Sequence, residues 1–83
     1  MRPRYLDTSE LEPPEPMQAV LAELATLAED EYLVMAHRKE PTPLYVILRT
    51  KYFCYHGRPG SRTPFELVIW REDGPTPDEV PQP

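Results

Sequence analysis

The chain of 83 residues contains three side chains that could bind a transition metal or act as nucleophiles: Cys54, His37 and His56. Cys54 and His56 alternate onto the same side of an expected strand, whereas His37 closes a different strand. A metal- or small-ligand-binding site made of these three residues is one interpretation. The other is structural, because a free cysteine within an apolar strand is commonly buried. A single cysteine also excludes an intrachain disulfide and a zinc site with several cysteine ligands.

The loop after the second expected strand carries Arg38, Lys39 and Glu40. In a parallel strand–helix–strand unit, the loops after both strands emerge at the same edge of the sheet, where open α/β folds bind ligands. We therefore expect the acidic segment 10–15 to lie next to Arg38 and Lys39. Free backbone N–H groups at the start of the second helix, near Thr42, could hold an anion there. The alternative is an ordinary surface salt bridge worth about 0–1 kcal/mol.

Catalytic arrangements are absent from the sequence. No serine, histidine and acid stand in a recognisable triad order, and the segment 57–60 reads as a hairpin turn rather than a phosphate-binding loop. Glu10, Glu12 and Glu15 could include a paired acid and base, but rigid proline spacing and expected exposure argue against that role. We therefore expect no enzymatic activity and no cofactor.

The charge balance limits the classes of partner. Nine Lys and Arg against fourteen Asp and Glu give a net charge of −5. This balance argues against a nucleic-acid-binding role, because such binding depends on neutralising phosphates. No apolar run approaches the ~20 residues of a membrane span, and the N-terminus lacks the apolar core of a signal peptide. We expect a cytoplasmic monomer or weak homodimer with a protein partner, and no contact with nucleic acid or membrane.

The elements that position these residues begin with two helices. Apolar residues recur at helical spacing from Met17 to Leu27, which predicts a helix of about four turns. The prolines at 13–16 suit its first turn, where a missing N–H has no helical partner. A second, shorter helix is expected from Leu44 to about Lys51, with Thr42 as its N-cap.

Three apolar segments predict strands, at Tyr32–Ala36, Phe53–His56 and Phe65–Trp70, and a short extended segment at Tyr5–Leu6 precedes the first helix. The order predicts an α/β (α+β) two-layer sandwich, βαβαββ, with a mixed four-stranded sheet and both helices on one face. The uncharged set Phe65, Leu67 and Ile69 should face the helices. We expect one domain over residues 5–72, a disordered N-terminal tail at 1–4 and a Pro-rich disordered C-terminal tail at 73–83.

Two motifs carry a family resemblance: Leu6-Asp7 with Leu11 and Pro13-Pro-Glu-Pro16 before the first helix, and His37-Arg-Lys-Glu-Pro-Thr-Pro-Leu-Tyr45. With them the chain resembles the TusA/SirA-like superfamily of small sulfur-transfer proteins, and within it an uncharacterised branch, domain of unknown function family 2249. The resemblance covers most of residues 6–70 and implies a TusA-like fold. In the carriers a cysteine before Pro-x-Pro holds a persulfide, and the matching position here is Pro13. The resemblance therefore does not extend to persulfide carriage.

We expect a non-catalytic interaction or regulatory module built on a sulfur-carrier-like scaffold. Members of the branch are often joined to, or lie beside, haemerythrin-like and nitrogen-oxide-handling proteins, so the resemblance points to redox or nitrogen-oxide metabolism. The alternatives are the metal or small-ligand protein described above and a sulfur-relay accessory, which would need a reactive Cys54. The expected partner or ligand surface lies at the edge near both helix starts and consists of Glu12, Pro13, Glu15, His37, Arg38, Lys39, Glu40 and Tyr45.

Overall fold

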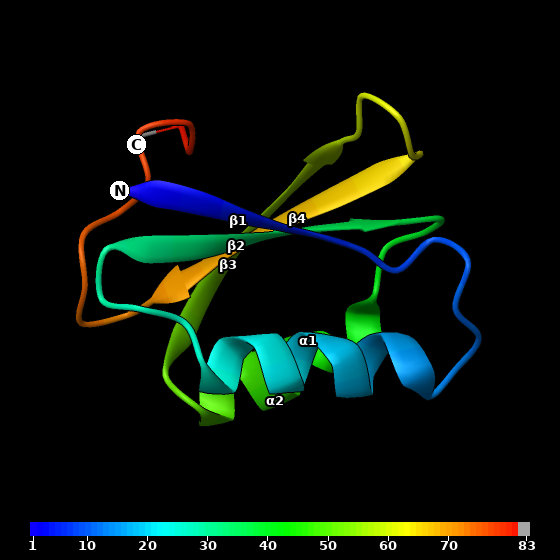
Figure 1. The fold of residues 1–83 in the computed structure, drawn as a ribbon, viewed down its shortest axis with the longest axis horizontal. Helices are drawn as coiled ribbons and strands as arrows, with labels where there is room; N and C mark the ends of the chain where they lie inside the picture. Colours follow the sequence, from blue (N-terminus) through cyan, green and yellow to red (C-terminus); the bar gives the residue numbers. More distant parts are fainter. Residues whose placement is uncertain (82–83) are drawn as a thin grey trace.

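The computed structural model describes residues 1–81 and has a mixed four-stranded sheet with two helices on one face (Figure 1). The elements are β1 (Arg2–Asp7), α1 (Glu15–Ala25), β2 (Glu31–His37), α2 (Thr42–Thr50), β3 (Phe53–Pro59) and β4 (Phe65–Arg71). The strand order is β1-β2-β4-β3, in which β1 and β2 are parallel and β4 is antiparallel to both its neighbours. The predicted βαβαββ sandwich is confirmed. Within the described residues, no helix is long and apolar enough to cross a membrane.

The main core lies between the sheet and the two helices. Leu33 and Met35 of β2 and Leu67 and Ile69 of β4 are buried there, with Phe65 packed against them. This confirms the predicted inner face of the last strand. The helices contribute their apolar stripes to the same cluster, from Val20, Leu24, Leu44 and Leu48. Burial of such side chains is the main favourable term for a domain of this size.

Residues 2–4, expected as part of a disordered tail, form the first half of β1. They pair in parallel with the start of β2, with Arg2 opposite Glu31 and Arg4 opposite Leu33. The Arg4 guanidinium lies 3.0 Å from the Glu23 carboxylate and 2.7 Å from that of Glu31. The strand is thus held by backbone pairing and ion pairs. Because these contacts do not produce an alternation of apolar residues, the sequence pattern does not predict this part of the strand.

The C-terminal segment returns to the face of the sheet that the helices leave open. Val80, the one aliphatic side chain of this segment, is buried against Tyr32, Val34, Val68 and Trp70. The Glu79 carboxylate accepts hydrogen bonds from the Tyr32 hydroxyl and the Arg58 guanidinium. Within the expected tail at 73–83, Glu79 and Val80 are therefore fixed against the sheet, and the last two residues lie outside the described residues. Apolar side chains on the second face of β2 and β4 supply the surface that this segment covers.

Candidate functional site

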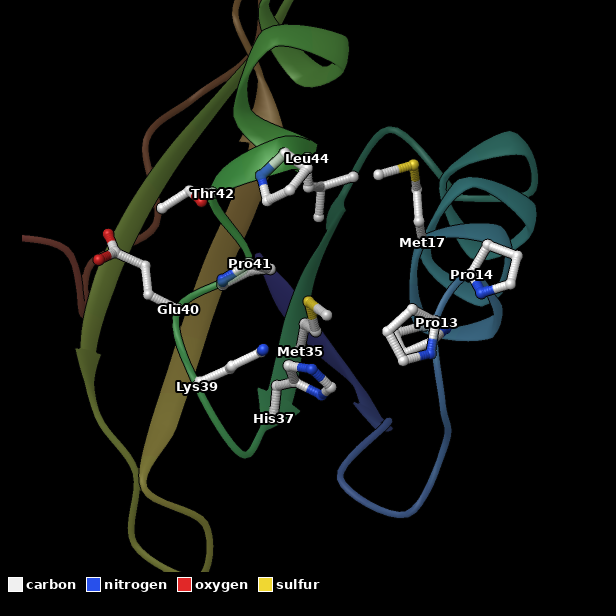
Figure 2. A pocket seen from close by; sticks show the side chains of 12 residues that line it. Pro13, Pro14, Met17, Met35, His37, Lys39, Glu40, Pro41, Thr42 and Leu44 are labelled. Carbon is white, nitrogen blue, oxygen red and sulfur yellow. The ribbon is translucent and has the colours of Figure 1, made fainter.

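A cleft of about 520 Å³ opens between the N-terminal ends of α1 and α2, beyond the end of β2 (Figure 2). One wall comes from the start of α1, the other from the loop before α2 and its first turn, and the floor from β2. The described lining residues are mostly apolar and are Pro13, Pro14, Pro16, Met17, Met35, His37, Lys39, Glu40, Pro41, Thr42, Pro43 and Leu44. This is the edge at which the parallel strands β1 and β2 end, where ligand sites are common in α/β folds.

Proline shapes both walls and removes hydrogen-bond donors from them. The Pro13–Pro14 peptide bond is cis, and the residue before the first turn of α1 is Pro14. At α2, the Thr42 N–H donates to the Glu40 carbonyl at 3.0 Å, and Pro43 has no N–H. The expected free N–H groups near Thr42 are therefore not available to an anion.

The expected N-cap role of Thr42 is also wrong. Thr42 is the first helical residue of α2, and Pro41 precedes it without a side-chain cap. The Leu44 N–H donates to the Pro41 carbonyl at 2.9 Å, so the backbone of the loop satisfies the first turn. A turn closed by its own backbone does not need the threonine hydroxyl as a cap.

His37 lies on the floor of the cleft and is only 5% exposed. Its Nδ1 lies 3.0 Å from Thr8 Oγ1 and 3.2 Å from the Thr8 carbonyl oxygen. The Thr8 hydroxyl donates its own hydrogen to the Ala36 carbonyl at 2.9 Å, so toward His37 both Thr8 oxygens accept. Nδ1 must therefore carry a hydrogen. Nε2 is the ring nitrogen left to meet an occupant of the cleft, and it bonds to no described residue.

Lys39 and Glu40 line the same cleft but point in different directions. Figure 2 shows the Lys39 side chain directed toward His37 and the Glu40 carboxylate directed away from it. Glu40 accepts a hydrogen bond from the Tyr45 hydroxyl at 2.8 Å, and Tyr45 stacks on Tyr55 with ring centroids 4.3 Å apart. Burial, and then the bond to Glu40, raise the pKa of Tyr45, which therefore stays a donor to this carboxylate. The charge directed into the cleft is thus positive.

Arg38 connects the loop after β2 to the loop after β1. Its guanidinium donates to the Leu11 carbonyl at 3.0 Å and lies 3.5 Å from the Glu12 carboxylate. The expected neighbourhood of the acidic segment and the basic pair is confirmed for these two side chains. Because 46% of the Arg38 side chain and 75% of the Glu12 side chain are exposed, the ion pair contributes about 0–1 kcal/mol.

The structure divides the residues of the predicted surface into four groups. Pro13, His37, Lys39 and Glu40 line the cleft, whereas Glu12 and Arg38 form the ion pair beside it. Glu15 is exposed in the first turn of α1. Tyr45 lies in a separate hollow with Tyr55 and His56.

Several residues of the site were not predicted. Met17 was identified only as the first position of an apolar helical stripe, and Met35 only as part of an apolar strand. The proline pair in Pro41-Thr-Pro43 predicts a loop and a helix start, and the structure places both prolines in one wall of the cleft. Thr8 lacked any signal, because its contact with His37 depends on how β1 and β2 pair.

The three candidate metal ligands do not come together. His37 lies in β2 on the helix side, two residues beyond Met35 of the main core. Cys54 packs against the second cluster on the opposite face of the sheet, and its partner in β4 is Trp70. His56 alternates onto the same face as Cys54. Within residues 1–81, no group of three or more His, Cys, Asp or Glu side chains is arranged to hold a metal ion.

Cys54 has the surroundings of a packed residue. It is partly buried among apolar side chains of the second cluster. Burial, and then the charge of Glu72, raise the pKa of the Cys54 thiol. Since the thiolate is the reactive form, these surroundings favour the structural interpretation.

Comparisons with known proteins place the chain in a family. Searches of the curated proteins and of the solved structures find no match. A family model described as "Uncharacterized conserved protein (DUF2249)" matches residues 5–71, which is most of the chain. The protein therefore belongs to this family of uncharacterised conserved proteins.

Proposed function

We propose that this protein is a non-catalytic interaction or regulatory module that acts through the edge at the starts of α1 and α2. The observation that carries the proposal is the orientation of His37. A nearly buried imidazole is held at Nδ1 by Thr8, and its other nitrogen meets an apolar cleft at the ligand-binding edge of the fold. Polar groups placed in this way fix the orientation of a bound group.

The surroundings of His37 support binding rather than catalysis. General acid–base chemistry needs a positioned partner or a reacting group within hydrogen-bond distance. Glu40, the carboxylate that lines the cleft, is directed away and accepts from Tyr45. Cys54, which a sulfur-relay accessory would need, lies on the other face of the sheet with a raised thiol pKa.

The TusA-like resemblance gives the proposal its setting. Pro13, which stands where the carriers have their persulfide cysteine, lies in the cleft wall beside the start of α1. The proposed module would thus use the same edge as a carrier without its sulfur chemistry. The resemblance further supports a cytoplasmic protein that serves redox or nitrogen-oxide metabolism and contacts a partner protein there.

The proposed partner edge, at the starts of α1 and α2, can be tested with two exposed lysines that lie at opposite ends of α2. Lys39 lines the cleft, whereas Lys51 lies at the far end of α2. Proteins captured from native extract by the wild type should be lost with Lys39→Glu and retained with Lys51→Glu. Quantitative mass spectrometry of the captured proteins makes the comparison, and fluorescence of Trp70 verifies that both variants are folded. Equal capture by the wild type and Lys39→Glu would overturn the proposal.

A further inference from the structure

We propose that the cleft binds a small monocarboxylate with an apolar aliphatic or aromatic body, its carboxylate held by His37 Nε2 and Lys39. This inference rests on the proposed function and names the ligand class of the same site. It combines three features of the cleft: its size, its polar end and its apolar walls.

The size and composition of the cleft fit a small molecule. Its volume of about 520 Å³ lies within the range of roughly 300–1,000 Å³ found for small-molecule sites. Such sites are mostly apolar and hold a few convergent polar groups. Here the convergent groups are His37 and Lys39, because Glu40 is turned away toward Tyr45.

The polar end calls for an acceptor with negative charge. Only 5% of the His37 surface is exposed, and its Nε2 bonds to no described residue. Lys39 makes no ion pair with any residue of the described chain. A carboxylate would accept from the Lys39 ammonium. Binding with uptake of one proton at His37 Nε2 would turn this nitrogen from an acceptor into a second donor, and Nδ1–H would still donate to Thr8. Charge-assisted bonds of this kind are stronger than neutral ones.

The apolar end calls for a body without hydrogen-bonding groups. Met17 and Met35 lie on the cleft side of α1 and β2, and Leu44 lies opposite Met17 across the cleft (Figure 2). Methionine adapts to irregular shapes and makes favourable contacts with aromatic rings. Proline walls offer no N–H to a polar body. A sugar or a peptide backbone would therefore lose its hydrogen bonds to water at these walls without replacement.

The test is an NMR titration of the full-length, ¹⁵N-labelled chain with benzoate, phenylacetate and hexanoate. Matched probes are benzamide and phenylacetamide, which keep the body but lack the charge, and inorganic phosphate, which has charge without the body. Amide signals of Met17, His37, Lys39 and Leu44 should shift with the carboxylates. Binding should weaken about tenfold with the amides and with Lys39→Gln, the loss expected for one charge-assisted contact of about 1.4 kcal/mol. Lys51→Gln should bind like the wild type.

Three results would overturn the inference: no shifts at these residues, equal affinity for amides and carboxylates, or equal affinity for phosphate and benzoate. Because the Lys39 side chain is exposed, Lys39→Gln should fold like the wild type, so a change in its affinity reports on binding alone. Failure of the proposed partner edge would look different. If carboxylates bind but Lys39→Glu still captures the same proteins, the ligand site stands and the partner edge is overturned. If Lys39→Glu loses the captured proteins but no carboxylate binds, the partner edge stands and the ligand site is overturned.

Discussion

Thr8 is the residue on which the orientation of His37 depends. Its side chain is fully buried, and its hydroxyl donates to the Ala36 carbonyl while accepting from Nδ1. The Thr8 carbonyl accepts from the same ring nitrogen. A single residue thus determines which nitrogen of the imidazole faces the cleft.

Replacing Thr8 with Val should destabilise the protein and leave the ring held by the Thr8 carbonyl alone. The shape is kept and two hydrogen bonds of the hydroxyl are lost, while the Ala36 carbonyl keeps the Thr8 N–H and Nδ1 keeps the Thr8 carbonyl. At about 0.5–1.5 kcal/mol for each lost bond, the unfolding free energy should fall by about 1–3 kcal/mol. Urea unfolding followed by Trp70 fluorescence measures this change, and the His37 ring signals in NMR report its orientation. The matched control is Thr50→Val, which removes an exposed hydroxyl bonded to the Val46 carbonyl and should change stability by less than about 0.5 kcal/mol. Equal effects of the two substitutions would contradict the role of Thr8.

At this scale the sequence predicted part of the site. Pro13, His37 and Lys39 follow from the rule that loops after parallel strands meet at one edge. Thr8 could not be predicted, because its bond to His37 depends on the register that places Asp7 beside Ala36. The direction of the Glu40 carboxylate likewise depends on Tyr45, five residues further along α2.

Among the elements, β1 shows how a strand can form with little apolar signal. It lies at the edge of the sheet, pairs only with β2, and is largely exposed. Arg4 connects this strand to the end of α1 and to β2, through Glu23, Thr26 and Glu31. Periodic apolar residues revealed the helices and the inner strands, but the first half of β1 depends on contacts between distant residues.

Replacing Arg4 with Gln should therefore cost more than replacing Arg2 with Gln. Arg4 bonds to three side chains and only about a quarter of its side chain is exposed, so its loss should clearly lower the denaturation midpoint. Arg2 forms one exposed ion pair with Asp30, and its loss should leave the denaturation midpoint almost unchanged. Chemical denaturation of both variants gives the two values. A larger loss for Arg2 would show that β1 is held by other contacts.

For the molecule as a whole, one face of the sheet is covered by the helices and part of the other by the C-terminal segment. The second cover is anchored by Val80 in the apolar cluster and by Glu79 between Tyr32 and Arg58. Burial, and then the Glu79 bond, raise the pKa of Tyr32 to about 12. Burial would raise the pKa of Glu79, but the bonds from Tyr32 and Arg58 outweigh it, so this pKa is lowered.

These shifts predict a loss of stability at high pH. A tyrosine whose pKa is raised in the folded state stabilises the protein below its ordinary value of 10, and this contribution disappears as the pH rises to about 12. The lowered pKa of Glu79 acts at the other end, with a contribution that is present above 4.5 and lost as the pH falls through the lowered value. Urea unfolding at intervals from pH 8 to 12 should show a shallower alkaline decline for Tyr32→Phe than for the wild type. Tyr52→Phe, at an exposed tyrosine, is the control and should follow the wild type. If stability declines with pH equally in all three proteins, the contact between Tyr32 and Glu79 does not contribute to stability.

The proline-rich rim of the cleft has a consequence for how an occupant enters. Five of the described lining residues are proline, and each has a ring that fixes its backbone torsion and leaves its side chain almost no rotational freedom. Side chains that are already ordered lose little conformational entropy when a ligand arrives, whereas flexible ones cost about 0.5–1.5 kcal/mol each. The proline part of the rim therefore has its shape before a ligand arrives, and only the methionine and lysine side chains of the cleft would lose conformational entropy on binding.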